Sequence, residues 1–411
     1  MTSPADIERQ DAGAKPPGAV AVVGVSVSAL AAATFAISSI GVLAPKLQSS
    51  FNLSRAGVGL LTSLMFLGAA LGSGPAGKLT DRRHPARVLG FSMAAFAGAV
   101  ALLALAQTLG VLLLAVALAG LAYGGVNPPT NVVVAGRMAR RVGFFLGLKQ
   151  SGVPLGGLLA GIVLPPVALA YGWRVSVGLA AVVCASAAIG VILIRNARGM
   201  VLADSGQGKE VSRRRIAALG TFGFVMAGSQ WAFLTYLVLF LTEQLHFGLA
   251  LAGLALALAQ GLGMCARLAW GWLSDVSGRR LEVLLVMAAI QVAALEFLAL
   301  VPVGAAAWPL VGLAGLSVIG WNGAFYGFVA ETAGPGRIGR VTGRALVLIF
   351  AGSVVFPPLL GALVDAVNSW RPLWALCGAL VAVAAIVLWA GFREPADVLT
   401  PTGAASKLAG E

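Results

Sequence analysis

Two cationic side chains, Arg267 and Lys149, stand inside apolar stretches of this sequence. Arg267 lies in the run Cys265-Ala-Arg267-Leu-Ala-Trp-Gly271, eight residues before Asp275. Neither cation has a carboxylate three or four residues away on its own stretch. A cation within a membrane costs roughly 2.5–3.5 kcal/mol on insertion scales and normally faces a wet cavity. The chemistry open to this pair is electrostatic binding of an anion; for Lys149 the alternative is an ammonium that reaches out to the membrane surface.

Neutral polar and aromatic side chains gather in a few of the apolar stretches and are scarce in the others. An Asn or Gln surrounded by hydrocarbon must find a partner or water, because its hydrogen bonds are otherwise unmade. Such residues are candidates for orienting a bound molecule, and the alternative for each is a hydrogen bond between helices without any ligand. The predicted binding residues beside the two cations are Tyr123, Asn127, Asn131, Gln230, Tyr236 and Asn322.

The elements that must position these residues are membrane-spanning helices. The chain has 411 residues, of which 59% are hydrophobic and only 10% are charged. In a soluble domain roughly a quarter of the residues are charged, so lipid must be the solvent for most of this chain. Twelve stretches approach or exceed the ~20 residues needed to cross the hydrocarbon core. They lie near residues 19–43, 56–76, 87–107, 109–135, 143–169, 175–194, 216–241, 250–272, 282–303, 308–331, 342–367 and 373–392.

The net charge of +13 reflects membrane topology. With the N-terminus inside, 22 of the 28 lysines and arginines fall on the cytoplasmic side and 4 on the opposite side. This split predicts cytoplasmic termini in a bacterial inner (plasma) membrane, with anionic lipid headgroups as the partner of the positive charge. Nucleic acid is therefore not an expected partner. The first apolar stretch lacks a small-residue cleavage pattern, so we expect it to be a retained helix.

A short motif occurs twice, at an offset of 194 residues. The first copy is Gly77-Lys-Leu-Thr-Asp81, and the second is Gly271-Trp-Leu-Ser-Asp275; a basic cluster follows each. Asn127 and Asn322 repeat at an offset of 195. Parallel repeats of this kind are expected of a transporter built from six plus six helices. The predicted division is a tail at 1–18, a bundle at 19–194, a middle loop at 195–215, a second bundle at 216–392 and a tail at 393–411.

The doubled motif, the six plus six helices and the long middle loop resemble the major facilitator superfamily over essentially all of residues 19–392. The resemblance implies an all-α membrane fold of twelve helices in two pseudo-symmetric six-helix bundles, working by alternating access. The end of the tenth stretch, Glu331-Thr-Ala-Gly-Pro335-Gly-Arg337, resembles the acidic-x-x-x-Pro-x-Arg run of that family. The resemblance places the gate that switches between open-out and open-in states at Gly77, Asp81, Arg82, Gly271, Asp275, Arg279, Glu331 and Arg337.

The pattern Arg-x-x-x-Gly-x-x-x-Asp that begins at Arg267 is similar to the helix 8 arginine of the monocarboxylate transporters and the oxalate:formate antiporter. In those relatives this arginine receives a carboxylate, a role that its planar guanidinium suits. This sequence departs from the monocarboxylate transporters at two positions. Gly263 stands where they have an acidic residue, and they carry a lysine within helix 1, whereas Lys46 lies at the outer end of that helix here. Proton coupling of that kind is therefore not implied.

Other functions are less well supported by the residues. Neither a metal-ligand spacing nor a phosphate loop is found, so we expect a protein without enzymatic activity, metal or cofactor. The cysteines Cys184, Cys265 and Cys377 all lie in apolar stretches and are expected to be packed core thiols. A channel remains an alternative, but the duplicated gate favours alternating access.

The sequence thus predicts a secondary active transporter of a small organic anion, a carboxylate being the leading candidate. The alternative is a proton-coupled exporter of drug-like or other small metabolites, for which a basic cavity is a poor fit. A proton is one candidate for the coupling ion. Of the groups that could relay it, Glu296 lies midway in helix 9, whereas Glu243, His246 and Asp365 lie near the outer surface.

Overall fold

The computed structural model describes residues 19–137, 148–193, 212–300, 306–333 and 338–393. Every spanning element in this part of the chain is a helix, and twelve helical stretches are long and apolar enough to cross a membrane. The predicted all-α membrane architecture is therefore confirmed. The predicted N-terminal tail, most of the middle loop and residues 394–411 of the predicted C-terminal tail lie outside the described residues. The second half begins with a helix at Arg213, inside the predicted loop.

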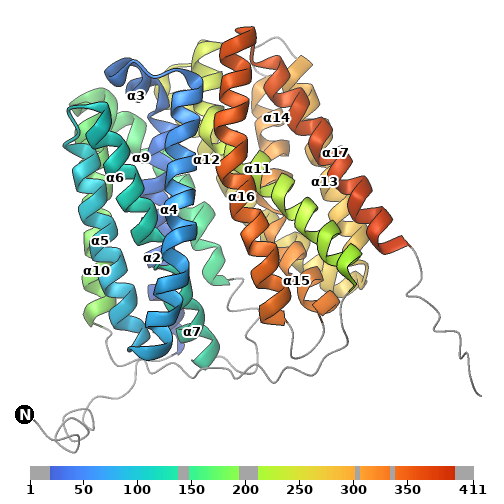
Figure 1. The fold of residues 1–411 in the computed structure, drawn as a ribbon. Coiled ribbons are helices and arrows are strands. Elements are labelled where there is room, and N and C mark those ends of the chain that lie inside the picture. Colours follow the sequence, from blue (N-terminus) through green and yellow to red (C-terminus); the bar gives the residue numbers. More distant parts are fainter. Residues whose placement is uncertain (1–18, 138–147, 194–211, 301–305, 334–337, 394–411) are drawn as a thin grey trace, which may run out of the picture.

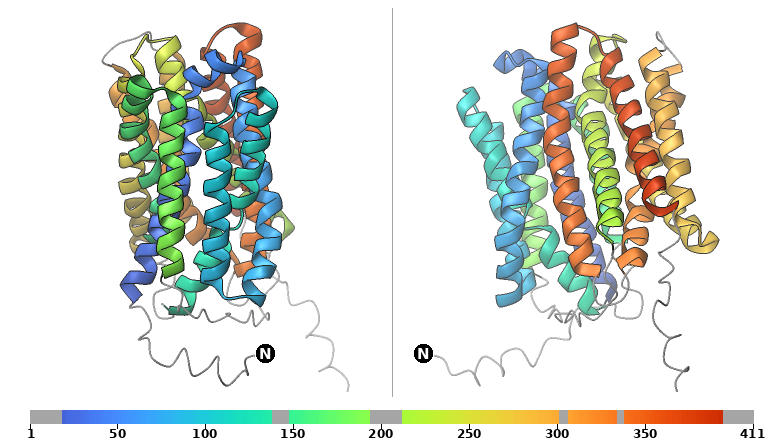
Figure 2. Two further views of the ribbon diagram at one scale, coloured as in Figure 1. Left: turned by 90° about the vertical axis from the view of Figure 1, so that its left-hand side faces the viewer. Right: turned by 45° about the vertical axis from the view of Figure 1, so that its right-hand side comes forward.

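The chain forms two groups of helices that stand side by side, coloured blue to green and yellow to red in Figure 1 and seen from two further sides in Figure 2. The first group comprises α2 (Ala19–Val42), α3 (Ala44–Phe51), α4 (Arg55–Arg82), α5 (Pro85–Ala104), α6 (Leu109–Tyr123), α7 (Asn127–Arg137), α9 (Gly152–Tyr171) and α10 (Trp173–Leu193). The second comprises α11 (Arg213–Glu243), α12 (Leu249–Ser277), α13 (Arg280–Leu300), α14 (Ala307–Ala314), the π-helix η2 (Gly315–Ile319), α15 (Asn322–Ala333), α16 (Ile338–Val367) and α17 (Arg371–Arg393). We call them the N bundle and the C bundle.

Local sequence explains where several helices begin and end. The hydroxyl of Ser54 accepts a hydrogen bond from the Gly57 amide at the start of α4, and Thr108 does the same for the amide of Val111 at the start of α6. Such caps satisfy amides that have no partner within the helix. At the other end, α12 stops at Gly278, whose φ of 63° is a left-handed conformation that favours glycine.

Two of the predicted continuous helices are interrupted near their middle. The fourth predicted stretch divides into α6 and α7, with a break at residues 124–126, and the tenth divides into α14, η2 and α15. Prolines 128 and 129 lack the amide hydrogen that would continue α6 into α7. The repeated pair Asn127 and Asn322 begins the second segment of each broken helix, so the sequence repeat marks a shared structural break.

The structure also corrects two smaller expectations. The repeated Gly-x-Leu-x-Asp motif reaches past the predicted stretches that end at 76 and 272, and we expected it to form the loops after them. It is helical instead: the first copy lies in the last turns of α4 and the second in the last turns of α12. Cys184 and Cys377 are buried as expected, but Cys265 is exposed, so a core position for that thiol was wrong.

Contacts between the two bundles concentrate toward one end. We call the end that carries Arg55 and Glu243 the outer end, and the opposite end the inner end, in line with the orientation predicted from charge. Helix α4 lies beside α16 and α11, and its hydrogen bonds to the C bundle come from its outer half. Helices α9 and α12 meet on the other flank, where an added Cβ at Gly161 would lie only 2.5 Å from the Gly253 carbonyl oxygen.

Candidate functional site

Arg267 lies on α12 at the boundary between the bundles and is buried, with 6% of its surface exposed. One terminal nitrogen, Nη1, donates to the Gln150 carbonyl of the N bundle at 2.9 Å, and Nη2 donates to the Ile319 carbonyl of η2 at 3.1 Å. Its Nε is buried without a hydrogen-bond partner. No carboxylate in the described part of the chain forms an ion pair with this guanidinium. The positive charge is therefore held by carbonyl dipoles alone, with donors to spare.

The π-helical turn explains why α12 can be held in this way. Segments of π-helix are frequent at functional sites because they disturb the regular hydrogen-bond ladder. Here two α12 side chains donate hydrogen bonds to carbonyl groups of the π-helical turn: Arg267 to Ile319, and Trp270 Nε1 to Leu316 at 3.1 Å. Gly323 lets the chains approach, since a Cβ there would lie 2.6 Å from the Arg267 carbonyl oxygen.

Lys149 is fully buried, so the alternative of an ammonium extended to the membrane surface is not realised in this conformation. Its Nζ donates to Asn127 Oδ1 at 3.4 Å, to Thr130 Oγ1 at 3.1 Å and to Asn131 Oδ1 at 2.5 Å. All three acceptors are neutral and belong to the first turns of α7. A lysine ammonium has three N–H groups, and these contacts occupy all of them.

Arg267 and Lys149 lie in adjoining segments, because Arg267 binds the carbonyl of Gln150, the residue that follows Lys149 in the sequence. Gln150 also has a buried Oε1 atom without a hydrogen-bond partner. Arg267 thus contacts the backbone beside Lys149, at the turn before α9, although Gln150 itself was not singled out from the sequence.

The other predicted binding residues lie in three environments. Tyr123 packs against Phe96 within the N bundle, with ring centroids 6.0 Å apart. Gln230 and Asn322 contact each other within the C bundle: Gln230 Oε1 accepts from Trp321 Nε1 at 2.8 Å and from Asn322 Nδ2 at 3.3 Å. This is the hydrogen bonding between helices that the sequence left open as an alternative. Tyr236 lies further out, at the outer contact between the bundles, and away from the two cations. A role for these residues in binding stays a prediction.

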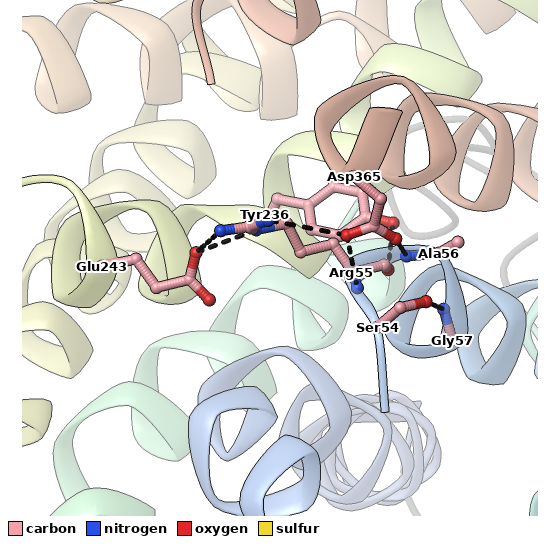
Figure 3. Close-up of polar contacts among 7 residues, drawn as sticks. All are labelled: Ser54, Arg55, Ala56, Gly57, Tyr236, Glu243 and Asp365. Carbon is pink, nitrogen blue, oxygen red and sulfur yellow. Dashed lines mark hydrogen bonds and ion pairs between the residues drawn. The ribbon is translucent and has the colours of Figure 1, made fainter. Parts of the chain in front are cut away.

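A cluster of charged residues connects the outer ends of three helices (Figure 3). Arg55, at the start of α4, forms ion pairs with Glu243 of α11 at 2.8 Å and with Asp365 of α16 at 3.6 Å. The carboxylate of Asp365 also accepts the backbone amides of Arg55 and Ala56, at 3.1 and 2.8 Å. The Tyr236 hydroxyl lies 2.9 Å from the Arg55 carbonyl oxygen, to which it donates. We call Arg55, Glu243, Asp365 and Tyr236 the outer lock.

Further contacts extend this closure inward along α4. Thr62 and Thr235 share a hydrogen bond of 2.9 Å between their hydroxyls, and Ser63 donates to the Val354 carbonyl at 2.5 Å. Below them, the rings of Phe66 and Trp231 pack with centroids 4.2 Å apart. The outer half of the interface on this flank is therefore closed.

At the inner end, the ionic contacts among the predicted gate residues lie within the C bundle. Arg280 pairs with Asp275 at 2.7 Å and with Glu331 at 3.0 Å. Both carboxylates were predicted gate residues, but their partner is Arg280 and not the predicted Arg279. Arg279 and, in the N bundle, Arg82 are exposed. A Cβ at either motif glycine, Gly77 or Gly271, would meet nothing within 4 Å, so neither makes a close helix contact in this conformation. Arg337 and the side chain of Asp81 lie outside the described residues.

With this geometry in place, the sequence matches the Major Facilitator Superfamily over residues 26–357. The chain belongs to the major facilitator superfamily. It is an integral, multi-pass membrane transporter by family and fold. An uncharacterized transporter of this superfamily from Mycobacterium tuberculosis is 27% identical over 373 residues, covering 87% of this chain and 82% of the relative.

Two further comparisons support the same assignment. Monocarboxylate transporter 11 of Homo sapiens is 27% identical over 387 residues, covering 86% of this chain and 80% of the relative. The fold is that of a bacterial homologue of the human lysosomal transporter Spinster, solved in an inward-facing and occupied conformation. That structure has a TM-score of 0.77 at 16% identity and covers 91% of this chain and 96% of its own. The predicted family and twelve-helix fold are thus confirmed, whereas the cargo is not tested by these matches.

The outer lock is the main feature that the sequence analysis missed. The sequence analysis considered Glu243 and Asp365 only as weak candidates for a proton relay, and it counted Arg55 only as one of the 4 basic residues on the outer side. One signal was available: three outer helix ends each carry a charge, and the sign at α4 is opposite to that at α11 and α16.

Proposed function

We propose that this transporter moves a small organic anion, a carboxylate, across the membrane by alternating access. One observation carries the proposal: Arg267 is buried between the bundles with an unpartnered Nε and no acidic partner among the described residues. A buried charge is normally neutralised by a pair, so a site with a fixed cation and free donors favours an anionic ligand. A cationic or apolar cargo would leave the guanidinium uncompensated.

Lys149 adds positive charge to the same region, and its contacts to α7 set its position. A bacterial inner membrane and cytoplasmic termini belong to the proposal as expectations, and a proton is one candidate for the coupling ion. The gate residues of the inner end would act with the Arg280 ion pairs, which hold α12, α13 and α15 together as one unit while the bundles move. The similarity to monocarboxylate transporter 11, itself named for a carboxylate class, supports an anionic cargo.

The test is uptake of a radiolabelled carboxylate panel into proteoliposomes by the wild-type protein and by Arg267→Ala. A hydrogen bond to a charged group contributes about 1.5–3 kcal/mol, so removal of one such contact should weaken the apparent affinity roughly 10- to 150-fold. Arg371→Ala, at an exposed arginine of the outer end, is the matched control and should transport normally. Transport of cations that is unaffected by Arg267→Ala would refute the proposal.

A pH jump with a fluorescent reporter inside the same vesicles decides the coupling ion. Acidification that depends on the carboxylate indicates proton symport. Uptake without a proton signal would assign the driving force to another ion or to exchange.

A further inference from the structure

Basic side chains gather where α11 begins and α17 ends, at the inner end of the C bundle. The first turn of α11 holds Arg213, Arg214 and Arg215, and α17 ends with Arg393. Arg214 Nη2 donates to the Ala390 carbonyl at 3.0 Å, so the two helix ends lie side by side. We call these four arginines the inner basic corner.

Two aromatic rings of α17 hold two of these guanidinium groups. The guanidinium carbon of Arg215 lies 5.3 Å from the centroid of the Phe392 ring, and that of Arg393 lies 4.4 Å from the centroid of the Trp389 ring. Stacking of this kind fixes a guanidinium over the face of a ring and leaves its N–H groups available to an anion. Trp389 is 41% exposed, and tryptophan is enriched at the headgroup level of membranes.

The positive charge of the corner lacks a counter-charge in the described part of the chain. No carboxylate there forms an ion pair with Arg213, Arg215 or Arg393. The first turn of α11 has no acidic residue, and its arginines stand at the positive end of the helix dipole, where a cation is unfavourable. On the neighbouring α15, Glu331 is already engaged by Arg280. An anion bound at the corner would offset this repulsion.

The corner lies at the face of the C bundle that meets lipid. Helix α17 stands at the edge of this bundle in Figure 1, and it packs mainly against α11, α13 and α16, which all belong to the same bundle. Val383, Ile386 and Trp389 are exposed and lead toward Arg393 at spacings of three, three and four residues. Such spacings place side chains on one face of a helix. An apolar stripe that ends in arginines suits a molecule with an apolar tail and an anionic head.

We infer that the inner basic corner binds an anionic phospholipid from the leaflet at the inner end, with the phosphate on the arginines and the acyl chains along the apolar stripe of α17. A general excess of positive charge attracts any anionic membrane surface. The corner differs from that general effect, because two of its guanidinium groups are held by aromatic rings and a third by a backbone carbonyl. This inference does not depend on the nature of the cargo. All residues of the site belong to the C bundle, so the lipid would stabilise that bundle without joining it to the N bundle.

The test counts the lipids bound to the full-length protein in detergent by native mass spectrometry, where no bilayer surface contributes. Anionic phosphatidylglycerol is compared with zwitterionic phosphatidylethanolamine. Each basic residue contributes a factor of about five to binding at an anionic surface, so the first phosphatidylglycerol should bind at least roughly tenfold more tightly than the first phosphatidylethanolamine. It should also raise the temperature of thermal unfolding, because it binds the folded protein. For the same reason of charge, Arg213→Gln with Arg393→Gln should weaken phosphatidylglycerol binding roughly 25-fold.

Three controls show whether the corner itself is responsible. Arg83→Gln with Arg87→Gln removes the same charge from exposed positions at the inner end of the N bundle and should leave the affinity unchanged. Arg213→Lys with Arg393→Lys keeps both charges and should retain most of the affinity. Glycerol 1-phosphate, a headgroup without acyl chains, should compete only weakly, since it cannot use the apolar stripe.

Several results would overturn the lipid site. Equal affinity for the two phospholipids, or an equal loss in the two glutamine double variants, would leave only the general attraction of a basic surface. A loss with lysine as large as the loss with glutamine, in variants that unfold at the wild-type temperature without lipid, would contradict the role of charge. Competition by glycerol 1-phosphate as strong as that by the lipid would show a site for phosphate alone.

Discussion

Loss of charge in the outer lock should shift the transporter toward an outward-open state. The change to make is the double variant Glu243→Gln and Asp365→Asn, which keeps side-chain size while it removes both partners of Arg55. Tyr236 is left in place so that its contact with the α4 backbone is unchanged. If the ion pairs hold the outer end closed, the double variant loses their contribution to the stability of the outward-closed state, and the population of the outward-open state rises.

The expected size follows from the geometry. The three side chains are 24–28% exposed, so each ion pair is worth only about 0.2–1 kcal/mol. The two oxygens of Asp365 also accept one backbone amide each at the start of α4, and because Asp365→Asn keeps only one acceptor oxygen, one of these hydrogen bonds, worth about 1 kcal/mol, is lost as well. Together the losses approach ~2 kcal/mol, and each 1.4 kcal/mol is a factor of ten in an equilibrium. The open fraction should therefore rise by roughly 30-fold wherever it is small in the wild type.

Accessibility of position 62 reports this shift. Thr62 is buried in the closed interface, two turns inward of Arg55. Thr62→Cys is introduced after the three native cysteines are replaced by serine, and its labelling by a membrane-impermeant maleimide is timed in intact cells. The double variant should label much faster than its parent, whereas Glu331→Gln, which breaks a pair at the inner end, should not. Equal labelling rates for the double variant and its parent would refute the lock.

Three further outcomes are expected. Tyr236→Phe removes a hydroxyl that binds two backbone carbonyls, worth about 1 kcal/mol, and should raise Thr62→Cys labelling about fivefold. Lys149→Met removes three charge-assisted hydrogen bonds of about 1.5–3 kcal/mol each, more than the ~3 kcal/mol cost of its charge in the membrane, so the melting temperature should fall. Gly161→Val places a side chain against the carbonyl of Gly253, and uptake should drop at least tenfold while Gly161→Ala retains more of it.

Much of the fold could be predicted because the bilayer dictates it. A helix must supply about twenty apolar residues to cross, so the stretches and their number are visible in the sequence. The half-chain repeat is visible too, and the pair Asn127 and Asn322 proves to mark equivalent breaks. The breaks themselves were not predicted, because an apolar stretch with glycine or proline in it has the same composition whether its helix is continuous or interrupted.

The candidate site was only partly predictable, for a related reason. A buried cation is conspicuous in an apolar stretch, which is why Arg267 and Lys149 were found. Arg55 and Asp365 sit at helix ends, where single charges are common, and only the packing of α4 against α16 reveals that they pair. Tyr236 shows the same limit: a tyrosine within a spanning helix looks alike whether its hydroxyl faces a cargo or a backbone carbonyl.

The contacts of Arg267 also suggest how binding of the proposed anion could be linked to movement of the bundles. The guanidinium bridges the bundles, with Nη1 on the Gln150 carbonyl and Nη2 on the Ile319 carbonyl. A carboxylate that binds across the free N–H groups of Nη1 and Nη2 accepts charge-assisted hydrogen bonds about twice as strong as those of a neutral carbonyl, so it shares Nη1 with the Gln150 carbonyl and weakens that contact. Ile319 belongs to the C bundle and moves with Arg267, so only the N-bundle contact is at stake. Binding would thus weaken one of the inner contacts between the bundles, and release of the anion would restore it. Because the same guanidinium receives the cargo and joins the bundles, binding of the cargo changes the contact between the bundles directly, without any further residue to connect the two.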